Sequence, residues 1–136
     1  MSCDSIETRT AIVRRADDRL LRFDMRAGAT VELADARELA AATRALMGAT
    51  PSLVLVDLRQ LRAVTREARI HLANPDAGTA AAAVALLVKS PVSRMIGNFF
   101  LGVSRASYPT RVFDSEQDAL DWLAGHRRIA PAREAG

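Results

Sequence analysis

The sequence predicts a single α/β domain with a mixed β-sheet of about five strands and four helices. Two apolar runs, 53–56 and 84–88, have the length and composition of strands buried on both faces of a parallel sheet. Segments with helical spacing of apolar residues alternate with these runs, and this alternation requires helices on the faces of the sheet. The chain of 136 residues is long enough to bury one core without further stabilisation.

The first two strands are predicted to form an antiparallel hairpin over 9–15 and 19–25, with a tight turn at Asp17 and Asp18. Apolar and polar residues alternate along the second strand, in the order Leu21, Arg22, Phe23, Asp24 and Met25. A period of two is typical of a strand that is buried on one face and polar on the other.

A helix is predicted over 33–47. Its apolar stripe consists of Ala36, Leu39, Ala40, Thr43, Leu46 and Met47. Asp35, Glu38 and Arg44 are expected on the side that faces away from the core. Gly48 is placed as the C-terminal cap of this helix, and a buried strand follows over 52–58.

The second helix is predicted to begin at Thr65 as N-cap and to end at Asn74, which precedes a proline. A buried strand over 83–89 then leads into the third helix. That helix begins with Ser90 and Pro91, a cap followed by a first-turn proline, and ends near Val103.

The last strand is predicted over 109–114 and the last helix over 115–124. Asp114 and Gln117 have the spacing of a capping box, and Gly125 is expected to end the helix. The sequence therefore predicts an N-terminal tail at 1–8, one domain over 9–125 and a flexible C-terminal tail at 126–136.

Composition and charge exclude several classes of protein. The basic residues are dispersed along the chain, so the net charge of +3 does not predict a nucleic-acid-binding surface. No apolar run is long enough to cross a bilayer and no secretory signal precedes the domain, so we expect no membrane insertion. Cys3 is the single cysteine, which excludes an internal disulfide and predicts a cytoplasmic location.

The sequence predicts no catalytic residues, no metal site and no cofactor, and hence no enzyme. His71 and His126 are far apart and are expected on helix surfaces, while Cys3 lies near the terminus. Gly97 and the residues to Ser104 have the glycine spacing of a phosphate-binding loop. Val103 occupies the position of the required lysine, and the segment has a helical pattern, so this match is accidental.

Several segments resemble small bacterial STAS-like (SpoIIAA-like) domains. The most distinctive is the stretch around Lys89, Ser90 and Pro91. The matching segments are 53–59, 64–69, 85–100, 108–113 and 118–123. The resemblance covers roughly residues 9 to 125 and implies a STAS-like fold, within a group that has no agreed activity.

In the sporulation regulators that give this fold its name, the domain binds a kinase that is also an anti-sigma factor. In those regulators, a serine at the start of a helix, within an Asp-Ser-Ser-Gly-like motif, is phosphorylated. The corresponding residues here are Thr65, Arg66, Glu67 and Ala68, without the serine or the glycine. The resemblance therefore does not extend to that phosphorylation switch, although Glu67 would supply a fixed charge weaker than that of a phosphate.

Two regions are candidates for binding. Asp57, at the end of a buried strand, is expected either to face a ligand or to bond backbone amides in its own turn. Together with two helix starts it defines a candidate anion-binding rim of Asp57, Arg59, Thr65, Arg66, Ser90, Ser93 and Arg94. The third helix offers a candidate subunit interface of Met95, Phe99 and Phe100.

Two functions follow from these regions. The first is a non-enzymatic STAS-like module that binds an unknown protein partner or forms a homodimer. The alternative is a small-ligand sensor that holds an anionic or nucleotide-like group at the rim around Thr65 and Ser90.

Overall fold

The computed structural model describes residues 4–17, 19–47, 52–73, 81–104 and 109–135. Its centre is a six-stranded mixed sheet in the order β1 (Ser5–Glu7), β2 (Ala11–Asp17), β3 (Leu20–Met25), β5 (Ser52–Asp57), β7 (Ala81–Leu87) and β8 (Thr110–Phe113). Two short strands, β4 (Thr30–Val31) and β6 (Ala63–Val64), pair separately. The predicted α/β class is confirmed, with one more strand in the sheet than expected.

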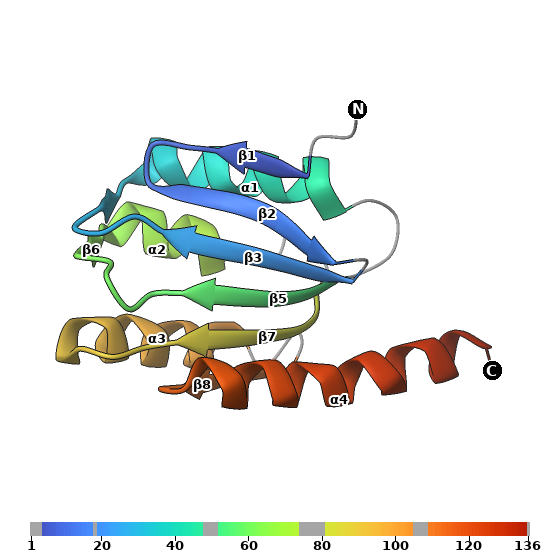
Figure 1. Ribbon diagram of the computed structural model, residues 1–136. Coiled ribbons are helices and arrows are strands. Elements are labelled where there is room, and N and C mark those ends of the chain that lie inside the picture. Colours follow the sequence, from blue (N-terminus) through green and yellow to red (C-terminus); the bar gives the residue numbers. More distant parts are fainter. Residues whose placement is uncertain (1–3, 18, 48–51, 74–80, 105–108, 136) are drawn as a thin grey trace.

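Four helices cover the sheet, as predicted (Figure 1). One face carries α1 (Leu33–Met47), α2 (Arg66–Ala73) and α3 (Pro91–Ser104). The other face carries α4 (Glu116–Ala135), which lies mainly against β5, β7 and β8. The side of β1, β2 and β3 that faces the viewer in Figure 1 is not covered by α4.

The sheet is mixed because it contains both antiparallel and parallel pairs of strands. β1, β2 and β3 are antiparallel to one another, and the pairs β3–β5, β5–β7 and β7–β8 are parallel. The predicted hairpin is confirmed. The first strand, within the segment expected to be a tail, was not predicted, because three residues are too few to show an alternating pattern.

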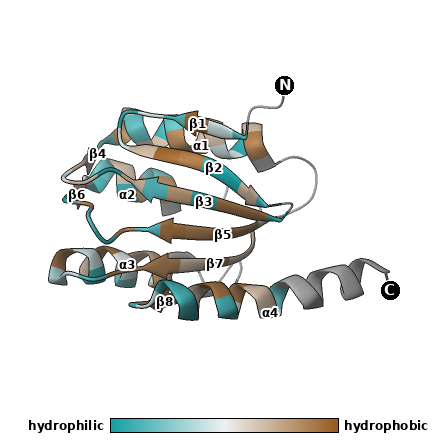
Figure 2. Cartoon of the chain, in the orientation of Figure 1, coloured by the Kyte–Doolittle hydropathy of each residue, from teal (hydrophilic) through white to brown (hydrophobic). Residues whose placement is uncertain are grey.

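The two central strands bury both of their faces, as their apolar runs predicted. Figure 2 shows β5 and β7 as mostly hydrophobic ribbons. On the face of α1, α2 and α3, Val54, Val84 and Leu86 belong to the larger core. On the face of α4, the smaller core contains Leu53, Leu55, Ala83, Ala85 and Leu87, packed with Ala119 and Leu123. The small side chains of Ala83 and Ala85 on β7 thus pack directly against α4.

The last helix differs from its prediction at both ends. Ser115, and not Asp114, caps α4, because the amide of Asp118 donates to Ser115 Oγ at 3.3 Å. Gln117 instead donates to Asp121 on the helix surface. The helix continues past Gly125 to Ala135; one glycine costs a helix only about 1 kcal/mol, so Gly125 does not end it.

Asp35 is the residue of α1 whose burial differs most from the prediction. The predicted stripe is buried at Ala36, Leu39, Ala40, Thr43 and Leu46. Asp35, which was expected to face solvent, is only 4% exposed. Its carboxylate accepts hydrogen bonds from the Arg9 guanidinium and from the amide of Glu32, so the first turn of α1 is tied to the β1–β2 turn. Arg9 is 26 residues away from Asp35 in the sequence, so the helical pattern of α1 could not indicate this pair.

Several predicted boundaries fall on residues that the structure does not describe. These are the turn at Asp18, the cap at Gly48 and the helix end at Asn74. Cys3 also lies outside the described residues.

Candidate functional site

The carboxyl ends of β5 and β7 and the starts of α2 and α3 lie at one edge of the sheet (Figure 1). The two strands are parallel neighbours, with Asp57 opposite Leu87 at the end of the ladder. α3 follows β7 after three residues, and α2 follows β6 near the same edge. The topology that brings Thr65 and Ser90 to one rim is therefore as the sequence predicted.

Both helix starts at this rim are capped from within the chain. Thr65 Oγ1 accepts the amide of Ala68 at 3.2 Å, and Ser90 Oγ accepts the amide of Ser93 at 3.0 Å. The two predicted N-caps are confirmed. In return, the fully buried Ser93 Oγ accepts the amides of Ser90 and Lys89 at 2.9 and 2.8 Å. This reciprocal arrangement is a capping box with serine in both positions.

Asp57 bonds within its own turn, one of the two roles predicted for it. Its carboxylate accepts the amide of Arg59 at 3.1 Å and two hydrogen bonds from the Arg59 guanidinium at 3.0 and 2.8 Å. Burial raises the pKa of the Asp57 carboxyl, but these hydrogen bonds and the charge of Arg59 outweigh it and leave the pKa lowered. Asp57 is therefore a carboxylate near neutral pH.

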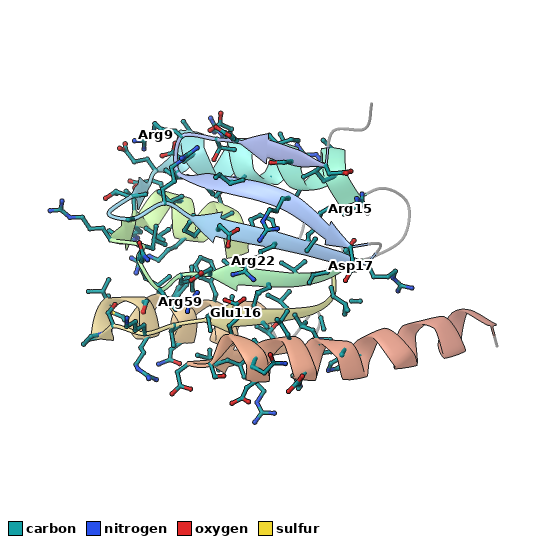
Figure 3. The ribbon with its side chains drawn as sticks, in the orientation of Figure 1. Arg9, Arg15, Asp17, Arg22, Arg59 and Glu116 are labelled. Atoms are coloured by element: carbon teal, nitrogen blue, oxygen red, sulfur yellow. The ribbon has the colours of Figure 1, made fainter. Side chains whose placement is uncertain are left out.

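Arg59 is also part of a larger ion network that the sequence did not predict (Figure 3). Arg22 on β3 donates two hydrogen bonds to Glu116 at 3.0 and 3.1 Å, and Arg59 donates to the same carboxylate at 3.2 Å. Arg22 also donates to Asp24 at 2.7 Å, and Asp24 accepts from Arg14 at 3.1 Å. The network runs from β2 across the sheet to the first turn of α4.

Arg22 is the centre of this network, with a side chain only 13% exposed. Hydrogen bonds to Glu116 raise its pKa, against the opposing effect of burial. The same bonds lower the pKa of the Glu116 carboxyl. Arg22 and Glu116 are 94 residues apart, so no local sequence pattern indicated that they would meet. Arg22 fits the polar half of the alternation along its strand, so the pattern gave no sign of its role in the network.

The seven residues predicted for the rim thus have different surroundings. The positive charge of Arg59 is already matched by Asp57 and Glu116. Arg94 is exposed and lies 3.5 Å from Asp114. Arg66 is exposed in the first turn of α2. Ser93 is enclosed by its own helix start.

A second feature lies on α2 and α3. Among the described residues, the exposed large apolar side chains are Ile70, Val92 and Met95, at 60%, 42% and 62% exposure. All three belong to these two helices. Of the predicted interface residues, Met95 is exposed and Phe99 is half-buried, with the Arg69 guanidinium 5.3 Å from its ring centre. Phe100 packs against the core.

No constellation typical of catalysis or metal binding occurs in the described part of the chain. His71 is half-buried on α2, and His126 contacts Trp122 on α4. Within those residues, no three histidine, cysteine or acidic side chains come together as metal ligands. None of the helices described is long and apolar enough to span a membrane.

Residues 14–127 match the family described as "Domain of unknown function (DUF7793)". The chain belongs to the DUF7793 family. No curated protein matches this member of the family.

Two solved structures are similar to this DUF7793 protein. One is an uncharacterised protein of the DUF3478 family with a SpoIIAA-like fold from Shewanella loihica PV-4, with 19% identity and a TM-score of 0.53. The match covers 83% of this chain and 91% of that one, and it confirms the predicted SpoIIAA-like fold. The other is a protein of unknown function from Arthrobacter sp. FB24, with 33% identity, 82% and 97% coverage and a TM-score of 0.30.

Proposed function

We propose that this DUF7793 protein is a non-enzymatic interaction or regulatory module, which binds another protein through the outer surface of α2 and α3. The observation that carries the proposal is that the exposed large apolar side chains among the described residues, Ile70, Val92 and Met95, all lie on these two neighbouring helices. Exposed apolar side chains that gather in one place mark interaction sites, whereas scattered ones do not. We call this surface, which also includes Phe99 between the helices, the α2–α3 face.

The chemistry of the rest of the molecule supports a binding role. The charged groups that cluster, such as Arg22, Arg59 and Glu116, are paired with one another. Pairing of this kind stabilises contacts between elements, and a group held in such a pair is a poor donor or acceptor of protons. The partner is either a second copy, as in a homodimer, or a different protein.

Site-specific cross-linking tests the proposal. A photo-cross-linking amino acid is placed at Met95, and in a matched control at Arg37, an exposed residue of α1. We expect protein adducts from Met95 in the native host and none from Arg37, with light scattering to show whether the adduct is a second copy. Equal adducts at both positions, or none at Met95, would reject the α2–α3 face as the binding surface.

The alternative is a small-ligand sensor at the rim around Thr65 and Ser90. Exposed cations near two helix starts, Arg66 and Arg94, favour an anion there. An anion would have to compete with the internal caps of both helices. If the sensor proposal holds, phosphate raises the melting temperature of the wild type and not that of the Arg66→Gln/Arg94→Gln variant. Equal stabilisation of both proteins contradicts it.

A further inference from the structure

The α2–α3 face combines an apolar row with an excess of positive charge. Val92, Met95 and Phe99 occupy positions i, i+3 and i+7 of α3, so they lie on one side of that helix. The row is about 10 Å long at the helical rise of about 1.5 Å per residue. Ile70 adds an exposed apolar side chain on the neighbouring helix.

The charged residues of α2, α3 and the segments before them are mainly basic. Segments 62–73 and 87–104 comprise α2, α3 and the residues before them. They contain one acidic residue, Glu67, and five basic ones: Arg62, Arg66, Arg69, Lys89 and Arg94. Asp114 offsets Arg94 in part. The formal net charge of the whole chain is +3. The positive excess of the chain is therefore concentrated in these two segments, and the remaining residues are close to neutral in sum. The positive ends of two helix dipoles lie at the same edge.

We propose that the α2–α3 face binds an acidic amphipathic helix of a different protein. The inference rests on the proposed function and specifies the partner. A helix with apolar side chains at i, i+3 and i+7 matches the row on α3. Carboxylates beside that apolar stripe would meet Arg66, Arg69 and Lys89, which gives the complementarity that selects partners and speeds association.

A second copy of the chain fits this face less well. A two-fold dimer places the same patch of both subunits in contact. The interface would then contain the basic excess of both copies, and like charges brought together at an interface are unfavourable. An acidic partner removes this repulsion.

An anionic membrane is a different occupant with the same charge. Its binding would require apolar groups that protrude into the lipid with basic groups around them. Here Glu67 precedes Ile70 by three residues on the exposed side of α2, and Asn98 follows Met95 by three on α3. Phe99 lies beneath the Arg69 guanidinium. Because Phe99 is covered in this way, only Val92 and Met95 of the row are exposed enough to enter a bilayer, which favours a helix as the occupant.

The test uses the full chain and a synthetic probe. The probe is a helical peptide as long as α3, with leucines spaced as Val92, Met95 and Phe99 are, and with glutamates at the flanking positions. One control peptide has the same composition in scrambled order, and a second has lysines in place of glutamates. Binding is measured by fluorescence anisotropy at low and high salt.

We expect the acidic peptide to bind at least about tenfold more tightly than either control, and less tightly as salt rises. Met95→Ser should weaken binding roughly tenfold through lost apolar contact. Arg66→Glu should weaken binding of the acidic peptide and strengthen binding of the lysine peptide. Arg37→Glu on α1 should change the binding of neither peptide. Unchanged melting temperatures would show that the exposed variants remain folded.

The outcomes separate the two proposals. Equal binding of the acidic and lysine peptides, or equal effects of Arg66→Glu and Arg37→Glu, would overturn the acidic-helix inference. So would a dimer lost on Met95→Ser, or Met95-dependent binding to phosphatidylglycerol vesicles without peptide binding. In the dimer case, cross-links from Met95 would still support the proposed function. Without such cross-links, the proposed function itself fails.

Discussion

At the scale of single residues, Gly97 shows how the absence of a side chain sets the distance between α3 and the sheet. A Cβ at this position would lie 2.8 Å from Val88 Cγ1, in the fully buried core. Such a contact is shorter than packed carbon atoms allow, so either the helix or Val88 would have to move. Gly97 is therefore a packing residue of α3.

We predict that Gly97→Ala lowers the free energy of unfolding by about 1–2 kcal/mol. The cost of overpacking is about 1–3 kcal/mol and exceeds the gain in helix propensity of up to about 1 kcal/mol. Urea denaturation measures the change. Gly102→Ala in the same helix is the matched control, because a Cβ there meets nothing within 4 Å. We expect Gly102→Ala to stabilise; a loss similar to that of Gly97→Ala would contradict the packing argument.

At the scale of elements, α4 is attached to the sheet by two kinds of contact. Ala119 and Leu123 pack on the apolar part of β5 and β7, and Glu116 in the first turn accepts hydrogen bonds from Arg22 and Arg59. Trp122, the single tryptophan, lies 5.6 Å from Phe113 between ring centres. Its fluorescence therefore reports the position of α4.

We predict that Glu116→Gln lowers the free energy of unfolding by about 1 kcal/mol, a modest value because Glu116 is 39% exposed. The variant removes the negative charge that faces Arg22 and Arg59 and keeps one oxygen as an acceptor. Gln117→Ala, in the same turn, is the control and should change the free energy by less than about 0.5 kcal/mol. Chemical denaturation followed by Trp122 fluorescence measures both; equal losses would show that the ion network does not hold α4.

Features that depend on residues close together in the sequence could be predicted from it. Thr65 and Ser90 cap their helices because capping depends on residues three positions apart. The contacts of Asp35 and Arg22 could not be predicted, because their partners come from other elements. Arg9 is 26 residues from Asp35 and Glu116 is 94 from Arg22. The apolar composition of α3 predicted an interface, but only the structure separates exposed Met95 from Phe100, which packs on the core.

At the scale of the whole molecule, three carboxylates couple folding to pH. The Arg9 guanidinium lowers the pKa of Asp35, and Arg22 lowers that of Glu116. For Asp57, burial opposes ionisation, but Arg59 lowers the pKa overall. A carboxyl whose pKa is lowered on folding stabilises the native state above its unfolded pKa, and the contribution is lost as pH falls through the folded value.

We therefore predict that the free energy of unfolding is nearly constant above about pH 6 and falls between about pH 5 and pH 3. Urea titrations at a series of pH values measure this dependence. Asp35→Asn combined with Glu116→Gln should be less stable at neutral pH and should depend less on pH. If the double variant and the wild type showed parallel curves down to pH 3, these ion pairs would not be the cause.

The strand order of the main sheet has a consequence for how the chain is made. From one edge to the other, β1, β2, β3, β5, β7 and β8 follow their order of translation. Each new strand leaving the ribosome therefore adds to the outer side of the sheet already present. None has to be inserted between two earlier strands. The nascent chain can grow its sheet by addition alone, and α4, which follows β8, then covers the apolar side of β5 and β7.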